Sequence, residues 1–535
     1  MKIEKIQLRT RITSSILVMF FLIGMTKVEA QIWQADNGDG TYKNPIIYAD
    51  YSDPDVVRVG DDYYMVASSF TCQPGIPVLH SHDLVNWTII NYVYHSLPFE
   101  RFKKPQHGHG SWAPSIRFHN GRFYVYFCTP DEGLFMASTT DPAKPWTLTH
   151  VLNVAQWEDP CPFWDEDGKA YLIHSKLCGG PAIMHRMSAD GTKLLDNGKV
   201  VYDNQTENPV LEGLKMMKKD GYYYIFAPAG GVPTGWQSVL RSENIYGPYE
   251  SKKVLQAGNG INGPHQGGFV DTQTGEWWFI HFQDKGVFGR VVLLQPGGWK
   301  EGWPVMGVDI NDDGVGEPVL SYKKPNVGKI YPKAEIQTND DFSSPNLGLQ
   351  WQWQAMPNPL WYSLTANKGN IRLYACQSPT EYGNLYYVPN LLLQKIMAPA
   401  FTAITKLTFA GSLPGERAGL TVMGNKHSFI CLQKTEKGNR VSLYESGFEN
   451  CGFIPVEIVG VDTDSNMVWL KVTVISNGTC TYAYSFDGVN YLPIEHVSKL
   501  EKGGWIGAKV GVFCLNPNVV QGQGYADFDF FNLQN

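Results

Sequence analysis

Residues 60–66 read GDDYYMV, a polar turn that leads into a run rich in aromatic side chains. Four later segments have the same form: NGRFYVY at 120–126, DGKAYLI at 167–173, DGYYYIF at 220–226 and GEWWFI at 275–280. A short apolar segment precedes each turn, so each instance predicts a β-hairpin. Their turn glycines lie 61, 47, 53 and 54 residues apart, at Gly60, Gly121, Gly168, Gly221 and Gly275.

Repeats of about fifty residues, each able to form a small antiparallel sheet, are typical of a β-propeller, where radial packing protects the sheet edges. No long segment has the periodicity of a helix. We therefore predict an all-β protein whose residues 31–323 form a five-bladed β-propeller. The alternative is a pair of β-sandwiches whose hairpins resemble one another by chance.

The repeat ends near residue 324, where the sequence becomes rich in lysine and proline, and we predict a linker over 324–339. Short alternating segments then continue to the end of the chain. They include IRLY at 371–374, LTVM at 420–423 and WLKVTV at 469–474. Alternation with short turns over nearly 200 residues predicts a β-sandwich over 340–535.

The first thirty residues have the pattern of a signal peptide. A basic start is followed by the apolar stretch SSILVMFFLIGM at 14–25, which is shorter than a typical membrane span, and by the small-residue cleavage pattern Val28-Glu29-Ala30. We predict export to the periplasm or the cell exterior, without membrane insertion after cleavage.

Composition narrows the possible partners. A net charge of −7 without a long basic run argues against binding to nucleic acid or anionic membranes. An aromatic fraction of 13% suits neutral sugars, whose C–H faces stack on rings. The nine cysteines are scattered singly, so zinc-finger and redox motifs are not indicated, and disulfide connectivity and oligomeric state stay open.

Candidate site residues, four of them ionisable, recur seven to ten positions before the turn glycines. They are Asp53, Trp112, Asp159, Glu212 and His265, one for each unit. In a propeller the innermost strand of every blade lines the axis, so we expect these side chains to gather at one mouth. Three of the five are carboxylates.

Gathered carboxylates have a use in glycoside cleavage, which needs a proton donor for the leaving oxygen and a base or nucleophile on the opposite face of the sugar. Crowded like charges raise the pKa of at least one acid and keep it protonated near neutral pH. Each residue also has a simpler interpretation. Asp53 and Asp159 both precede proline and could be turn residues, while Glu212 could be a solvated loop acid with Glu207 as its rival.

These segments resemble glycoside hydrolase family 43 over about residues 40–310. The resemblance rests on an ordered set of motifs: Tyr51-Ser52-Asp53-Pro54-Asp55 before the first hairpin, Trp112-Ala113-Pro114, Asp159-Pro160, and Glu212-Gly213 before the fourth hairpin. The C-terminal region resembles the concanavalin-like β-sandwich appended to β-xylosidases of that family.

The resemblance implies an inverting mechanism, with Asp53 as general base, Glu212 as general acid and Asp159 tuning the pKa of that acid. It also implies that Arg290 binds sugar hydroxyls. His265 matches a histidine found near a bound calcium ion or water at the propeller centre, so a structural Ca²⁺ is an option, although no cofactor is required. Phe70 and Trp112 are candidates for a sugar-stacking wall, or else for blade packing.

The expected activity is removal of terminal pentoses, xylose or arabinofuranose, from plant polysaccharide fragments such as those of xylan. A sandwich that closes one side of the pocket would favour such exo action. One departure bears on the sugar: Leu214-Lys215 follows Glu212-Gly213 where many xylosidase-like members have Pro-His. Two alternatives stay open: a retaining propeller hydrolase of fructosides with Asp53 as nucleophile, and a non-catalytic carbohydrate-binding propeller.

Overall fold

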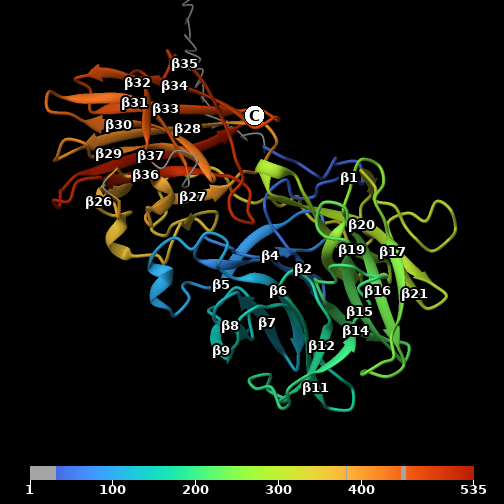
Figure 1. Ribbon diagram of the computed structural model, residues 1–535. Coiled ribbons are helices and arrows are strands. Elements are labelled where there is room, and N and C mark those ends of the chain that lie inside the picture. Colours follow the sequence, from blue (N-terminus) through green and yellow to red (C-terminus); the bar gives the residue numbers. More distant parts are fainter. Residues whose placement is uncertain (1–31, 381, 448–453) are drawn as a thin grey trace, which may run out of the picture. The chain divides into compact units, whose positions relative to one another are not determined.

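A computed structural model describes residues 32–380, 382–447 and 454–535 (Figure 1). The predicted signal peptide lies outside the described residues. Within them the chain is nearly all strand, with short 3₁₀ helices at η1 (Glu100–Lys103), η2 (Gly286–Phe288), η3 (Pro359–Trp361) and η4 (Leu385–Tyr387). No helix in these ranges is long and apolar enough to span a membrane.

Five four-stranded antiparallel sheets follow one another along the chain and form the blades. Blade 1 holds β2 (Asp55–Val59), β3 (Asp62–Val66), β4 (Gly75–Ser81) and β5 (Thr88–Tyr94). Blade 2 holds β6 (Trp112–His119), β7 (Arg122–Thr129), β8 (Gly133–Thr139) and β9 (Thr147–Asn153). Blade 3 holds β10 (Trp157–Trp164), β11 (Ala170–Lys176), β12 (Ala182–Met187) and β13 (Lys199–Tyr202).

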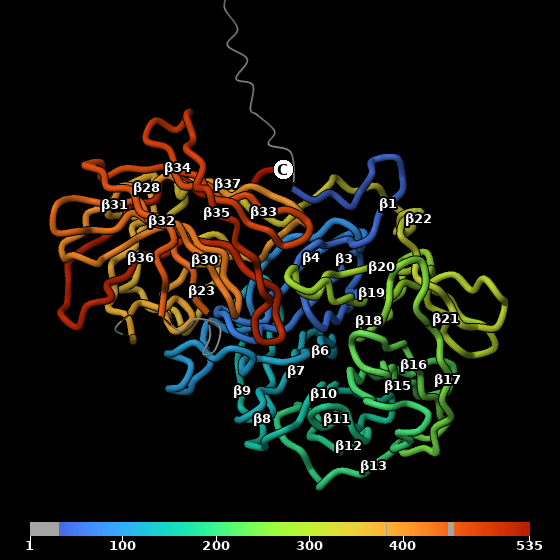
Figure 2. Tube along the Cα trace, turned by 45° about the horizontal axis from the view of Figure 1, so that its top comes forward, coloured from blue at the N-terminus to red at the C-terminus, as the bar shows by residue number. Residues whose placement is uncertain are grey.

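Blade 4 holds β14 (Lys215–Lys219), β15 (Tyr222–Ala229), β16 (Trp236–Ser242) and β17 (Glu250–Leu255). Blade 5 holds β18 (His265–Asp271), β19 (Trp277–Asp284), β20 (Arg290–Lys300) and β21 (Trp303–Met306). Figure 2 shows these sheets arranged in a ring, and contacts of β18 with β2 close it. The predicted five-bladed propeller is confirmed.

The five repeated turns are the β-hairpins between the first two strands of each blade. Their glycines have φ between 65° and 87°, the left-handed region that favours glycine. Buried apolar side chains fill the space between neighbouring blades. Val66 and Val78 of blade 1 pack with Ile116 and Val125 of blade 2, for example, and similar clusters lie between the other neighbours. This packing fixes the angle between blades.

The C-terminal region is a sandwich of two antiparallel-rich sheets, as predicted. One sheet has the order β23-β27-β36-β29-β30-β31-β32, with β26 beside β36, and the other has the order β24-β25-β37-β28-β33-β34-β35. Apolar side chains from both sheets form one core. The strands are β23 (Gln352–Trp353), β24 (Tyr362–Ser363), β25 (Ile371–Tyr374), β26 (Cys376–Gln377), β27 (Leu392–Lys395), β28 (Phe401–Ala410), β29 (Arg417–Met423), β30 (Lys426–Lys434), β31 (Asn439–Gly447), β32 (Val456–Thr463), β33 (Met467–Val474), β34 (Thr479–Ser485), β35 (Leu492–Lys499), β36 (Lys509–Asn516) and β37 (Tyr525–Gln534).

Residues 324–339 lie between β22 (Ser321–Lys323), which pairs with β1 (Thr41–Lys43), and the sandwich. Propeller and sandwich also touch directly. A β-bridge joins Gln73 to Trp353, and the Lys395 ammonium donates a hydrogen bond to the Asp50 carbonyl at 2.6 Å. The eight described cysteines are free thiols; Cys451 lies outside the described residues.

Candidate active site

One cavity at the mouth of the propeller gathers six of the seven candidate residues. Asp53, Asp159 and Glu212 line it together with Arg290, Phe70 and Trp112. The seventh, His265, is fully buried behind Glu212, with Nε2 3.3 Å from the carboxylate. The rival acid Glu207 does not line the cavity; it accepts hydrogen bonds from Tyr202 and Asn204 on the outside of its blade.

A residue with a left-handed backbone conformation recurs near the start of every inner strand. Such φ angles are costly for residues other than glycine and cluster at functional sites. The five residues and their φ values are Asp53 (53°), Ala113 (39°), Asp159 (56°), Gly213 (65°) and Gln266 (38°). In β6, β10 and β18 the strand register also shifts at this point.

The position of this left-handed residue corrects the equivalence of site residues between blades that was inferred from spacing. Asp53 and Asp159 occupy the left-handed position, whereas Trp112, Glu212 and His265 stand one residue before it. The distance to the hairpin varies with strand length, so spacing alone cannot separate two adjacent positions. Because successive residues point in different directions, the mouth carries two distinct sets of side chains.

The Asp53 carboxylate accepts hydrogen bonds from residues of two blades. Ser68 donates to Oδ2 at 2.6 Å, and the Arg290 guanidinium donates to Oδ1 at 2.8 Å. Arg290 also donates to the Ser52 hydroxyl, and its own N–H donates to the Asp50 carboxylate. These bonds fix the orientation of the Asp53 carboxylate at the cavity wall.

Asp159 connects blade 3 to blades 4 and 5. The Gly213 N–H donates to its carboxylate at 2.6 Å and the Gln266 side chain donates at 3.2 Å. Burial raises the pKa of Asp159, and these donors oppose the rise. Since Gly213 directly follows Glu212, Asp159 positions the backbone that carries this acid.

Glu212 has the protonation behaviour of a general acid. Burial, followed by the nearby charge of Asp159, raises its pKa to about 8, while Arg290 acts in the opposite direction. Burial lowers the pKa of His265 to about 3, so the histidine beside Glu212 is neutral and the contact is not an ion pair. The Glu212 carboxyl is therefore protonated near neutral pH.

Aromatic rings form one wall of the cavity. The ring centroid of Phe70 lies 6.1 Å from that of Trp112, which lies 6.4 Å from that of Trp505. Trp505 belongs to the sandwich and is 57% exposed. Gly108 allows its approach, because a Cβ there would lie 3.1 Å from the Trp505 ring. The sandwich therefore closes one side of the pocket.

Sequence reasoning missed Glu158, Gln266 and Trp505, all of which line the cavity. Glu158 and Gln266 adjoin predicted residues, and only the register shift reveals that both members of each pair reach the mouth. Trp505 is 215 residues from Arg290, the last predicted site residue, and belongs to no repeat; the preceding Gly503-Gly504 pair was the available signal.

The surroundings of His265 bear on the calcium prediction. Both ring nitrogens are buried without a hydrogen-bond partner among the described residues, which leaves a coordination position open. Calcium prefers six to eight oxygen ligands, whereas the close neighbours supply one carboxylate, from Glu212, and the positive charge of Arg290. These residues do not match the oxygen-rich shell that calcium prefers, and a bound calcium ion stays a prediction.

Comparisons with known proteins agree with this architecture. The profile of "Glycosyl hydrolases family 43" matches residues 42–304, and that of "Beta xylosidase C-terminal Concanavalin A-like domain" matches residues 339–534. A putative beta-xylosidase of Xylanibacter ruminicola is 45% identical over 504 residues, covering 91% of this chain and 88% of the relative. A beta-xylosidase of Formosa agariphila is 34% identical, covering 95% and 92%.

A non-reducing end alpha-L-arabinofuranosidase of Bacteroides ovatus is 28% identical, covering 97% of this chain and 98% of the relative. Among solved structures, a family 43 protein of Bacillus licheniformis superposes with a TM-score of 0.80 at 26% identity, covering 92% of this chain and 99% of that one. With the fold, the site and these similarities in agreement, the chain belongs to glycosyl hydrolase family 43.

Proposed function

We propose that the protein is an inverting, exo-acting β-xylosidase or α-L-arabinofuranosidase that removes terminal pentoses from fragments of plant polysaccharides such as xylan. The single observation that carries the proposal is the meeting of Asp53, Asp159 and Glu212, from three blades, in one cavity. The names of the similar xylosidases and of the arabinofuranosidase supply the sugar class.

The proposed reaction is a single displacement. Glu212 donates its proton to the glycosidic oxygen while Asp53 accepts a proton from the water that attacks the anomeric carbon from the opposite face, so the configuration inverts. Arg290 keeps the Asp53 carboxylate in place, and Asp159 positions Glu212 through Gly213. Arg290 is also the only lysine or arginine among the described residues that line the cavity, which suits it to bind sugar hydroxyls.

Exo action follows from the wall that Trp505 adds. Trp505 of the sandwich lines the cavity beside Trp112, so we expect it to block a polysaccharide that continues past this side and to leave room for a terminal sugar.

The departure at Leu214-Lys215 is compatible with this chemistry. The buried Lys215 ammonium donates to the Pro114 carbonyl at 3.1 Å and to the Ser115 hydroxyl at 2.8 Å, on the inner strand of blade 2. Its charge also opposes the rise in the pKa of Asp159. Lys215 is therefore accommodated by hydrogen bonds to blade 2 and stabilises the charged form of Asp159.

We also propose that the protein is exported and that its partner is a carbohydrate, not nucleic acid or membrane. The pattern of residues 1–30 and the net charge of −7 support these proposals.

The test is hydrolysis of a panel of nitrophenyl glycosides by the mature chain, with xylopyranoside and arabinofuranoside compared directly. We expect turnover of at least one, and NMR should detect first the anomer opposite to that of the substrate. Release of the same anomer would support the retaining alternative. Calorimetric binding without turnover on any pentoside would support a carbohydrate-binding propeller.

A further inference from the structure

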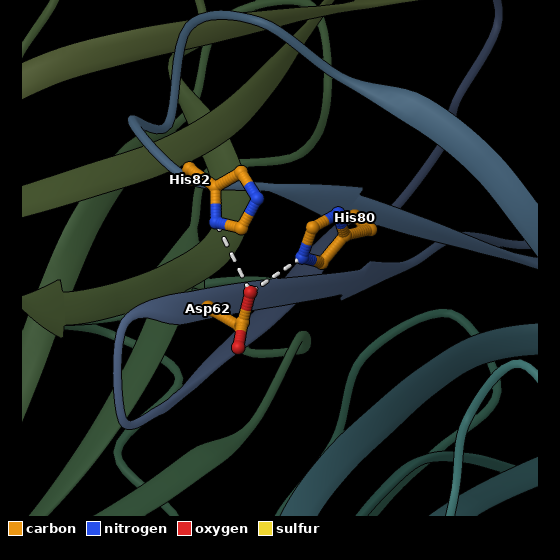
Figure 3. Close-up of side chains that lie close together, drawn as sticks. All are labelled: Asp62, His80 and His82. Atoms are coloured by element: carbon orange, nitrogen blue, oxygen red, sulfur yellow. Dashed lines mark hydrogen bonds and ion pairs between the residues drawn. The ribbon is translucent and has the colours of Figure 1, made fainter. Parts of the chain in front are cut away.

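A group of metal-ligating side chains lies on blade 1, away from the cavity: Asp62, His80 and His82 (Figure 3). Asp62 begins β3, His80 lies in β4 and His82 follows that strand. Tyr63 pairs with Ser81 across these strands, so Asp62 lies opposite His82. Because alternate residues of a strand share a face, all three side chains project from the same face of the blade.

Both imidazoles have a ring nitrogen close to the same oxygen. Nε2 of His80 lies 2.8 Å and Nδ1 of His82 lies 3.1 Å from Oδ1 of Asp62, and the ligand atoms of all three residues lie within 4.8 Å of one another. Tetrahedral zinc, with bonds of about 2.0–2.2 Å, sets its ligand atoms about 3.3 Å apart. The two nitrogen–oxygen distances are slightly shorter than this, so a small movement of the Asp62 carboxylate away from the rings would admit the ion.

One nitrogen of the cluster is left without a hydrogen bond. Nδ1 of His82 is buried, and its contact with Asp62 lacks hydrogen-bond geometry. A buried polar atom without a partner is costly, and a metal bond would satisfy it. The side chains of the three residues are between 21% and 42% exposed, so an ion can enter from solvent.

Neighbouring rings hold the ligands in place. His82 stacks on Tyr331 with ring centroids 4.5 Å apart, and His80 lies 5.3 Å from Tyr64. Tyr331 belongs to the connection between propeller and sandwich, which Lys329 also fastens to Asp61 beside the cluster. These ring contacts restrict the two imidazoles, so less side-chain freedom is lost when a metal ion binds.

We propose that Asp62, His80 and His82 form a site for one divalent transition-metal ion, with Zn²⁺ as the best match and water completing the coordination shell. Two imidazoles and a carboxylate suit zinc, and imidazole disfavours calcium and magnesium. The bound ion links β3 to β4 and, through Tyr331, steadies the connection that crosses blade 1.

The test is calorimetric titration of the metal-free mature chain with ZnCl₂ at pH 7.5, alongside His80→Ala, His82→Ala and Asp62→Asn. The matched control is His496→Ala, which removes a histidine that pairs with a single carboxylate, Glu445, at 2.9 Å. We expect one zinc ion per chain, at least tenfold weaker binding in each site variant and unchanged binding in the control. The partly exposed His82 makes its alanine variant the one least prone to unfold, which a thermal melt would verify.

Cobalt provides a second readout, because the visible spectrum of bound Co²⁺ reports its coordination number. A tetrahedral spectrum in the unaltered chain, lost in His82→Ala, supports the site. Absence of zinc binding at millimolar concentration, or equal binding by His82→Ala and the unaltered chain, overturns it.

An independent observation concerns Glu158, which stands one residue before the left-handed step of blade 3, as Glu212 does in blade 4. Glu158 lines the cavity and is 7% exposed. The Gly179 N–H donates to its carboxylate at 3.0 Å, and no side chain of the described residues hydrogen-bonds to it or brings a positive charge within 4 Å. Its carboxyl group is therefore available to a ligand in the cavity.

The Glu158 carboxyl group can donate a hydrogen bond because it is protonated. Burial, followed by the charge of Asp159, raises its pKa to about 9. At neutral pH the group is a carboxylic acid, which can donate one hydrogen bond as well as accept.

We infer that Glu158 is a specificity-determining residue that donates a hydrogen bond to a hydroxyl group of the sugar in the cavity. This inference rests on the proposed function. Because the donor is neutral, Glu158→Gln should keep most of the activity on aryl pentosides, whereas Glu158→Ala should lower kcat/KM about 10–100-fold, the effect of one lost hydrogen bond in a buried site.

Singly deoxygenated aryl pentosides separate recognition from a structural role. For the substrate that lacks the recognised hydroxyl, the unaltered chain and Glu158→Ala should have the same kcat/KM. An equal loss on every deoxy substrate, or a Glu158→Gln variant as weak as Glu158→Ala, overturns the inference. Failure of the unaltered chain on all pentosides would instead refute the proposed function.

Discussion

If Glu212 is the general acid, its replacement by glutamine should reduce activity most on substrates with poor leaving groups. Proton donation contributes about 10²–10⁴-fold to such reactions, or about 2.7–5.4 kcal/mol at 1.36 kcal/mol per factor of ten. Glu212→Gln should lose this factor on xylobiose, whose leaving sugar needs a proton. The variant should lose far less activity on a dinitrophenyl xyloside, because the dinitrophenolate leaves as a stable anion without a proton.

The pH profile gives a second measurement on the same variant. The working form of Glu212 is protonated, and its pKa is raised to about 8. The activity of the unaltered chain on xylobiose should therefore fall as the pH rises through about 8, and this basic limb should be absent from the residual activity of Glu212→Gln.

Glu207→Gln is the matched control, because Glu207 is the neighbouring acid whose carboxylate is bound by Tyr202 and Asn204 outside the cavity. It should behave as the unaltered chain on both substrates. Equal losses by Glu212→Gln on xylobiose and on the dinitrophenyl xyloside would refute the assignment, as would a large loss in the control.

Three further predictions test other parts of the site. Arg290→Gln, which removes the guanidinium from Asp53, should lower kcat on good and poor leaving groups alike by about 10²–10³-fold, and a loss confined to KM would contradict this. Trp505→Ala should raise KM for xylobiose with little change in kcat or in the melting temperature, because the side chain is 57% exposed; a drop in kcat alone would speak against a wall. Gly213→Ala should destabilise the fold by about 1–3 kcal/mol in denaturant unfolding, since its Cβ would lie 2.7 Å from Pro228; Gly221→Ala, also left-handed but with open space around it, should cost less.

The fold and much of the site could be predicted from the sequence because they depend on local signals. Each hairpin needs a left-handed glycine beside two strands, and that requirement is visible at Gly60 and its four counterparts. Ring closure then brings Asp53, Asp159 and Glu212 together without further information.

The remaining features depend on tertiary geometry. A register shift at Asp159 turns two adjacent residues toward the mouth, so Glu158 could not be distinguished from an outward-facing neighbour. Trp505 reaches the cavity through the docking of another sheet system, which no local pattern encodes. The Asp62, His80 and His82 cluster needs the β3–β4 register, and the histidines alone do not reveal it.

The contact of Lys395 with Asp50 has a consequence for how this enzyme can be divided. Lys395 donates to the Asp50 carbonyl, the Asp50 carboxylate accepts from the Arg290 N–H, and the Arg290 guanidinium donates to Asp53. A series of polar contacts thus connects the C-terminal sandwich to the Asp53 carboxylate. We therefore expect that a truncated chain ending after the propeller would keep Asp53, Asp159 and Glu212 but lose the Lys395 contact that supports the Asp50–Arg290–Asp53 contacts.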